Sequence, residues 1–274
     1  MATWAPQPQG LQEVLQTLHE STDMNVAVQR AITQKLNNFT RAPEYIAYLA
    51  YILTAMPQEE DRIRTIAGYL LKNNARLILT SAPEVAQYVK AATLQAFTDE
   101  SLMIRNAAGQ DIVALLNHLE PRNWPECLQQ LMSTLDSPDL DRQEAAFNVL
   151  EKACEDYPRK MDVEINGSRP LDFMIPKFLM LADHPSAKMR SHAIACLSYF
   201  VPLFKLASDD EPSVRRHVCQ ALVLLLAARP EKLMPEMNNV AEYMLYSTKD
   251  KNENVALEAY EFWLTFAEDA DLAG

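Results

Sequence analysis

The sequence predicts an all-α protein built from a repeated pair of helices. Glycine is scarce, with 5 residues against 16 prolines in a chain of 274. Apolar residues recur with the 3.6-residue period of a helix, and these stripes return along the chain at a nearly constant interval. Because five glycines are too few for the turns of a many-stranded sheet or for a phosphate-binding loop, we expect helices separated by proline-containing turns.

The repeated stripe is an anchor residue followed by apolar residues at +4, +8 and +11, a spacing that places them on one helix face. Most anchors follow an acidic, Ser- or Pro-containing turn, and these residue types cap helix N-termini. The stripes predict the second helix of each pair. Their anchors, all apolar except Arg142, are Val28, Ile63, Ile104, Arg142, Met189, Val214 and Val255.

Apolar segments between these stripes predict the first helix of each pair. They cover residues 11–20, 44–54, 84–97, 125–135, 171–181 and 235–246. The anchors are 35, 41, 38, 47, 25 and 41 residues apart. A period of about 40 residues with two helices per unit is typical of HEAT and armadillo repeats. We therefore predict one elongated domain over residues 1–274, a right-handed α-solenoid of about seven HEAT repeats whose second helices line a concave binding surface.

Two of the intervals depart from the period. The interval of 47 contains residues 156–172, which we expect to form an extended loop between repeats. The interval of 25 lacks most of the first helix of the sixth repeat, and the shortfall falls between Pro202 and Leu203. We expect residues to be missing there, either skipped by the numbering or deleted. A Cα–Cα distance across this bond far above about 3.8 Å would indicate skipped residues.

Charge and motifs argue against several classes of function. The formal charge of −12, without a basic run longer than two residues, excludes an electrostatic nucleic-acid binder. The sequence has no membrane span, no signal-peptide profile, and neither a metal-binding histidine pair nor a nucleotide or nucleophile motif. We predict no cofactor and no enzyme activity. The four cysteines, without a CxxC pair, are expected to be small buried hydrophobic residues: Cys127, Cys154, Cys196 and Cys219.

Five short strings go beyond the generic repeat. They closely resemble the N-terminal arch of the importin-β (karyopherin-β) family of nuclear import receptors, and in particular receptors for cargo with PY-type nuclear localisation signals. The resemblance runs nearly end to end, although the sixth repeat is short and Gly274 lies about a third of the way along such a receptor, so we expect the N-terminal part of a longer protein. The strings are residues 69–74, 123–125, 173–179, 190–196 and 254–264.

The resemblance implies a binding module that shuttles between cytoplasm and nucleus. In this family the second helices of the first repeats bind the GTP-bound GTPase Ran, whereas PY-signal cargo binds C-terminal repeats absent from this chain. Nucleoporins with phenylalanine-glycine repeats bind apolar clefts between neighbouring first helices. The alternative is a generic HEAT-repeat scaffold for a protein assembly.

Four residues are candidates for Ran-GTP contact by resemblance: Lys72, Asn73, Arg64 and Arg105. Each also has a structural interpretation. Lys72 would complement the helix dipole, and Asn73 and Asn74 would cap the helix C-terminus. The arginines that follow the anchors would each pair with an aspartate of the adjacent repeat, which is the interpretation we favour for Arg64, Arg105, Arg190 and Arg215. Trp124 and Trp263 are expected to pack inside the fold.

Overall fold

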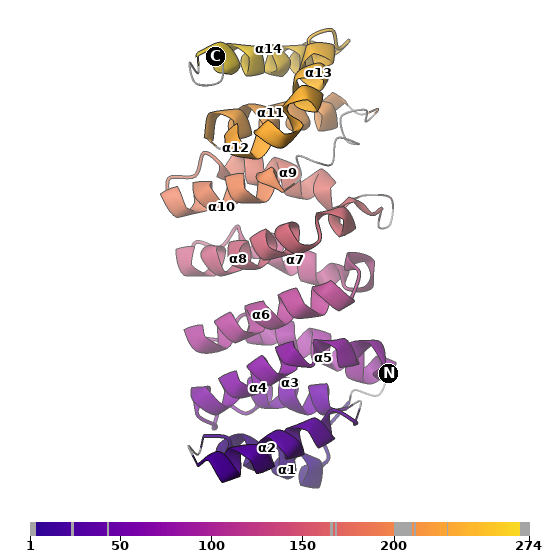
Figure 1. The fold of residues 1–274 in the computed structure, drawn as a ribbon, viewed down its shortest axis with the longest axis vertical. Helices are drawn as coiled ribbons and strands as arrows, with labels where there is room; N and C mark the ends of the chain where they lie inside the picture. The colour runs from indigo at the N-terminus through magenta and orange to yellow at the C-terminus, as the bar shows by residue number, and fades with distance from the viewer. Residues whose placement is uncertain are drawn as a thin grey trace. The chain divides into compact units, whose positions relative to one another are not determined.

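The computed structural model describes residues 4–22, 25–42, 44–164, 167, 169–199, 210, 212–228 and 230–268. Its contacts divide the chain into two compact units, Met1–Ser137 and Pro138–Gly274, each of which is described by itself. All regular elements of the described residues are helices (Figure 1), so the prediction of an all-α protein is confirmed.

Unit 1 alternates the predicted first and second helices. The predicted bounds are confirmed to within a few residues, and short 3₁₀ turns at Ala75–Leu79 and Pro121–Asn123 follow α4 and α6. The helices are α1 (Pro8–Glu20), α2 (Val26–Phe39), α3 (Tyr45–Ala55), α4 (Asp61–Asn73), α5 (Pro83–Ala96), α6 (Leu102–His118) and α7 (Pro125–Thr134).

Helices of the same kind are neighbours in unit 1. The first helix α3 packs on α5, and the second helix α4 packs on α6 (Figure 1). Their sequences explain the two layers. The middle of α3 is apolar on all sides, and Ile46, Leu49 and Leu53 are fully buried, whereas α4 buries only the stripe that includes Ile63 and Leu71. The other side of α4 is left to carry polar side chains.

Unit 2 follows the same plan. The second helices α8, α10, α11 and α14 pack in sequence on one another, and Leu222, Leu225, Val240 and Phe262 lie in the core that α11, α13 and α14 share. The helices are α8 (Leu140–Asp156), α9 (Pro170–Leu181), α10 (Ala187–Ser198), α11 (Pro212–Ala228), the single turn α12 (Pro230–Leu233), α13 (Met237–Ser247) and α14 (Glu253–Glu268).

The structure describes most of the long interval between repeats but not the shortfall in the short one. The segment between α8 and α9 contains a 3₁₀ turn at Pro158–Asp162, and Gly167 there has a φ of 85°, a conformation that favours glycine. The predicted shortfall between Pro202 and Leu203 lies outside the described residues. Trp124 is 1% exposed at the start of α7, which confirms its predicted packing role.

Candidate partner-binding surface

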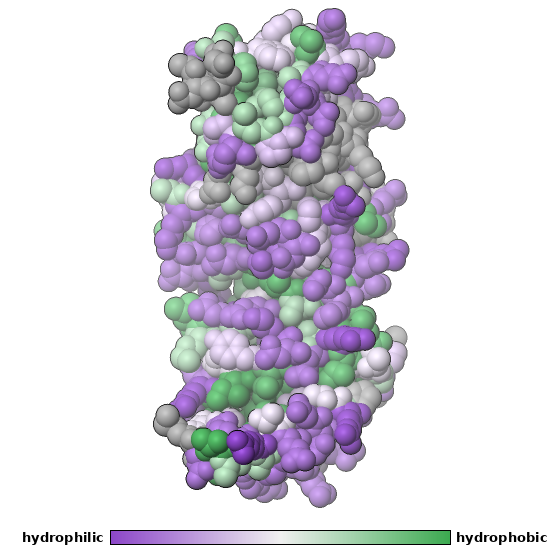
Figure 2. Space-filling model, viewed as in Figure 1, coloured by the Kyte–Doolittle hydropathy of each residue, from purple (hydrophilic) through white to green (hydrophobic). Residues whose placement is uncertain are grey.

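The exposed side of α4 carries a short polar stripe. Tyr69, Lys72 and Asn73 are exposed at positions i, i+3 and i+4, which share one face of a helix. The opposite side of the same turns buries Ala67 and Leu71 against the core. We call these three exposed residues the α4 stripe. Over α4 and α6, hydrophobic residues are interspersed among hydrophilic ones on the face shown in Figure 2.

Lys72 connects the α4 stripe to α6. Its Nζ donates a hydrogen bond to Oε1 of Gln110 at 2.9 Å, and both side chains reach the surface. Lys72 lies in the last turn of α4, where a cation is favourable to the helix dipole. The C-cap is Asn74, whose Nδ2 donates to the carbonyl of Leu70 at 2.8 Å. The capping role that we expected for this pair of asparagines therefore belongs to Asn74, and Asn73 remains exposed.

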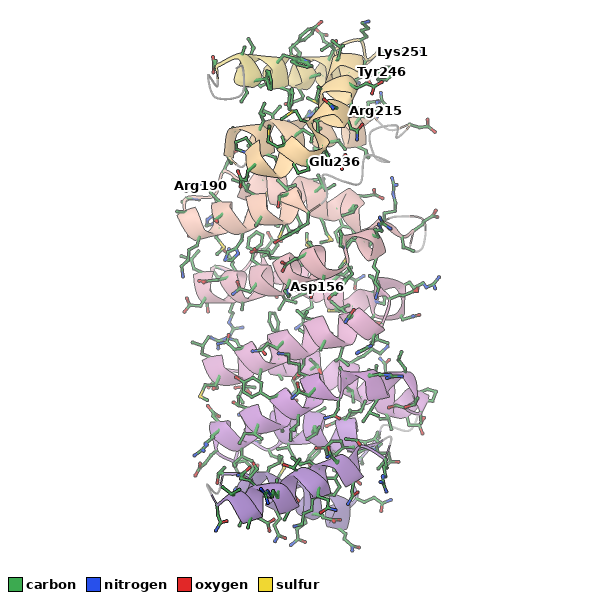
Figure 3. All side chains as sticks on the ribbon, in the orientation of Figure 1. Asp156, Arg190, Arg215, Glu236, Tyr246 and Lys251 are labelled. Carbon is green, nitrogen blue, oxygen red and sulfur yellow. The ribbon has the colours of Figure 1, made fainter. Side chains whose placement is uncertain are left out.

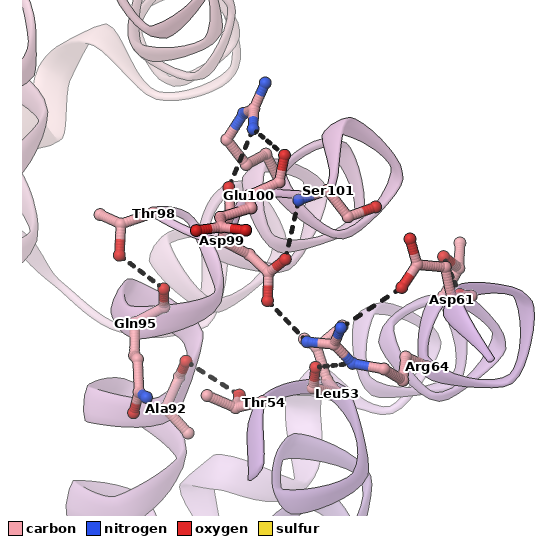
Figure 4. A network of polar contacts seen from close by, with 12 residues as sticks. Leu53, Thr54, Asp61, Arg64, Ala92, Gln95, Thr98, Asp99, Glu100 and Ser101 are labelled. Carbon is pink, nitrogen blue, oxygen red and sulfur yellow. Dashed lines mark hydrogen bonds and ion pairs between the residues drawn. The ribbon is translucent and has the colours of Figure 1, made fainter. Parts of the chain in front are cut away.

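Arg64 lies on the buried side of α4 and is only 5% exposed. Its Nε donates to the carbonyl of Leu53 at 3.0 Å, Nη1 donates to Asp61 at 3.3 Å, and Nη2 donates to Asp99 at 2.6 Å (Figure 4). Asp99 belongs to the turn before α6, where its other oxygen accepts the N–H of Ser101. The guanidinium thus joins α3, α4 and the next repeat, as the structural interpretation predicted.

Arg215 on α11 of unit 2, labelled in Figure 3, also binds an aspartate of the following turn. Its Nε and Nη2 donate to the two carboxylate oxygens of Asp250 at 2.8 and 2.9 Å, and Asp250 also accepts the N–H of Asn252. The hydrogen bonds of Arg215 lower the pKa of Asp250 below its usual range. Both arginines reach an aspartate 35 residues further along the chain.

Arg105 and Arg190 both bind backbone carbonyls. Arg105 Nη1 donates to the carbonyls of Asp99 and Glu100, and Arg190 Nη1 donates to the carbonyls of His184 and Pro185, at 2.8–2.9 Å in each case. Each guanidinium therefore closes the turn before its own helix. For Arg105 the predicted pairing with an aspartate of the adjacent repeat is replaced by carbonyl capping, whereas for Arg190 most of the turn that would supply the aspartate, residues 200–211, lies outside the described residues.

Asp111 is the residue that sequence reasoning missed. It lies on α6, is 0% exposed, and neither of its carboxylate oxygens has a hydrogen-bond partner. Burial raises the pKa of Asp111 well above its usual range, and the nearby Lys72 offsets this only in part. One signal was available: Asp111 is seven residues after the anchor Ile104, so it falls on the apolar face of its helix.

A glycine lets Asp111 approach α4. A Cβ added to Gly68 would lie 2.9 Å from the Cβ of Ala107 and 3.4 Å from Oδ2 of Asp111. The two helices are therefore in close backbone contact one turn before Lys72, and the neutral form of the carboxyl is favoured in this apolar contact. The buried acid and the exposed lysine belong to the same α4–α6 interface.

Sites of other kinds are not found in the described part of the chain. No group of three or more His, Cys, Asp or Glu side chains there could hold a metal ion. All four cysteines are buried, as expected. No helix within the described ranges is both long enough and apolar enough to span a membrane.

Comparison with known proteins identifies relatives of this chain. No family model matches. The sequence is 42% identical to mouse transportin-1 over 282 residues, which cover 97% of this chain and 31% of transportin-1. It is 40% identical to importin subunit beta-2 of Schizosaccharomyces pombe over 288 residues, covering 98% of this chain and 32% of that protein. The chain thus spans about a third of the length of these relatives.

Solved structures share the fold at low identity. Kap95p, solved as a protein whose binding induces the switch loops of RanGDP to adopt the GTP-bound conformation, matches with a TM-score of 0.60 and 19% identity, covering 96% of this chain and 35% of Kap95p. Importin β matches with a TM-score of 0.56 and 20% identity, covering 92% of this chain and 33% of that one. The chain is therefore a homologue of transportin-1 and importin subunit beta-2, and the resemblance to the importin-β family is confirmed over the N-terminal third of these proteins.

Proposed function

We propose that the chain is the N-terminal part of a nuclear import receptor and that its second helices bind Ran-GTP, which controls the release of cargo. The receptor moves between cytoplasm and nucleus, and PY-signal cargo binds repeats beyond this chain. In this proposal the helices of both units continue one right-handed solenoid of about seven HEAT repeats, the sixth of which lacks most of its first helix. A generic HEAT scaffold remains the alternative.

The α4 stripe is the observation that carries the proposal. Tyr69, Lys72 and Asn73 give one exposed face an aromatic ring, a cation and an amide, a combination suited to protein recognition. Two structural neighbours are described with Ran, namely Kap95p with RanGDP and Kap121p with RanGTP. Arg64 and Arg105 are not part of the α4 stripe; both bind the turn before α6, the helix whose Gln110 accepts the hydrogen bond of Lys72.

A groove on the first helices is a candidate for nucleoporin binding. A cavity of about 610 Å³ lies where α3 and α5 begin, and its apolar walls include Ala42, Tyr48 and Val85. Kap95p is described in a complex with Nup1. We assign phenylalanine-glycine segments of nucleoporins to this groove, since its volume and apolar walls accommodate an aromatic side chain, while Glu44, Thr80 and Ser81 in the same lining can bind peptide N–H groups.

Binding to Ran is the decisive experiment. The chain is titrated with Ran loaded with a non-hydrolysable GTP analogue or with GDP, and we expect preference for the GTP form. Lys72→Glu should weaken this binding at least tenfold, because the reversed charge repels the group on the partner that the lysine attracted. The matched control is Lys90→Glu on α5, where the lysine donates to the carbonyl of Asn123. Equal binding of both nucleotide forms, or loss of binding with Lys90→Glu alone, would favour the scaffold.

A further inference from the structure

The segment before α1 packs away from its own repeat. Its first described residue, Trp4, contacts tyrosines of the next two first helices: the indole centroid is 5.3 Å from the ring of Tyr48 on α3 and 4.8 Å from the ring of Tyr88 on α5. The N–H of Gln7 donates to the hydroxyl of Tyr48 at 3.4 Å. Residues 4–7 therefore form a strap across α3 and α5.

The slot that holds Trp4 is built by two helices that pack on each other. Tyr48 and Tyr88 project from α3 and α5, which pack on each other through buried residues such as Val89. Gly10 lies against the ring of Tyr48, because a Cβ at Gly10 would come within 2.8 Å of the tyrosine hydroxyl and 3.0 Å of Cζ. The absence of a side chain at this position lets the ring stand where it meets Trp4.

The slot is suited to an uncharged aromatic group. The Trp4 ring meets Tyr48 edge-to-face at an interplanar angle of 86° and meets Tyr88 at 45°, and such tilted arrangements are favourable for aromatic pairs. Burial, with a smaller contribution from Tyr51, raises the pKa of Tyr88 to about 12, so its hydroxyl is neutral at physiological pH. Neither wall of the slot carries a formal charge.

The slot and the groove proposed for nucleoporins share a wall. Tyr48 lines the 610 Å³ cavity together with Val85, and Val85 is one turn before Tyr88 on α5. A segment bound in the cavity therefore lies against the same tyrosine, Tyr48, that contacts Trp4.

We propose that Trp4 is an intramolecular occupant of the slot between Tyr48 and Tyr88, and that it competes there with the aromatic side chain of a peptide that extends from the neighbouring groove. The strap then acts as an autoinhibitory plug that must leave before the peptide can bind in full. The proposal rests on the proposed function for the identity of the peptide, a phenylalanine-glycine segment, but not for the existence of the slot.

A chemical probe tests the slot without any nucleoporin. Trp4→Ala is titrated with N-acetyl-tryptophanamide by calorimetry, with circular dichroism to check that the variant is folded. We expect Trp4→Ala to bind the amide at least tenfold more tightly than the parent chain. Adding Tyr88→Ala should abolish this binding, and the neighbouring exposed Gln9→Ala should bind like the parent. Equal binding by Trp4→Ala and the parent, or binding that survives Tyr88→Ala, would overturn the proposal.

A second measurement uses the unmodified chain. As a synthetic phenylalanine-glycine peptide saturates it, the indole N–H resonance of Trp4 should move to the position of a free tryptophan, while those of Trp124 and Trp263 stay in place. A peptide that binds without moving the Trp4 resonance would refute the plug and leave the nucleoporin function standing. Binding of the amide by Trp4→Ala without any peptide binding would support the slot and refute that nucleoporin function.

Discussion

Replacing Asp111 with Asn should change how the stability of the chain depends on pH. The folded protein holds this carboxyl fully buried and without a hydrogen-bond partner, and burial raises its pKa well above the usual 3.8. In the unfolded chain the same carboxyl loses its proton near pH 4. Between these two pKa values the folded state binds one proton more than the unfolded state.

The magnitude follows from this one-proton difference. Stability changes with pH by 2.303RT for each proton of difference, so the folded state loses roughly 1.4 kcal/mol per pH unit as the pH rises from about 4 toward the folded pKa. The contribution of Asp111 is fully present below the unfolded pKa and is lost as the pH rises through the folded pKa. Asp111→Asn removes this slope and keeps the shape of the side chain.

Urea denaturation followed by circular dichroism at half-unit steps from pH 5 to pH 7.5 measures the effect. The difference in unfolding free energy between Asp111→Asn and the parent should rise with pH at up to about 1.4 kcal/mol per unit, because titration of all other groups cancels in the difference. Asp111→Leu should give the same slope. A difference that stays constant over this range would show that Asp111 is ionised in the folded chain and would refute the reasoning.

Three further predictions concern the packing of the repeats. Arg64→Ala should lower the unfolding free energy by about 3–5 kcal/mol because it leaves Asp99 without its buried partner, whereas the neighbouring exposed Arg62→Ala should change it by less than about 0.5 kcal/mol in the same urea titration. Gly68→Ala should lower the unfolding free energy by about 1 kcal/mol. Overpacking against α6 costs about 1–3 kcal/mol, which exceeds the helix-propensity gain of up to about 1 kcal/mol. An increase in the urea concentration at the midpoint of unfolding would contradict this, because it would show that α4 and α6 move apart without cost. Asp250→Asn should lower the melting temperature more at pH 7 than at pH 3, because the pKa of Asp250 is lowered in the folded chain and its stabilisation declines as the pH falls from the unfolded pKa through the folded pKa. Calorimetry at both pH values decides this, and an equal loss at pH 3 would contradict it.

The helices could be predicted from the sequence because their signals are local. The stripe from Ile63 to Leu71 places these residues on one buried face, and α4 is found there with its polar face outward. Even the weak stripe from Arg142 corresponds to a helix, because Asp139 caps it by accepting the N–H groups of Asp141 and Arg142. Periodicity and capping depend on residues three or four apart, which a single sequence displays directly.

The polar contacts could be predicted only where both partners follow the repeat. Arg64 and Arg215 find an aspartate at a fixed distance along the chain, so the repeat predicts them. Arg105 occupies the same position in its helix but bonds to carbonyls, because its geometry depends on how the preceding turn closes. Asp111 and the Trp4 strap depend on close approaches between segments distant in sequence, at Gly68 and Gly10, and spacing within one helix contains no information about them.

The two kinds of arginine contact have a mechanical consequence. Where an arginine grips the aspartate ahead of the next second helix, as Arg64 and Arg215 do, bending at that joint must stretch a charged hydrogen bond across it. Where the contact stays within one turn, as for Arg105 with the carbonyls of Asp99 and Glu100, it stiffens that turn and does not resist bending at a joint. We therefore expect the joints bridged by Arg64 and Arg215, after α4 and α11, to be stiff, so that a curved partner is accommodated by movement at other joints rather than by uniform flexing.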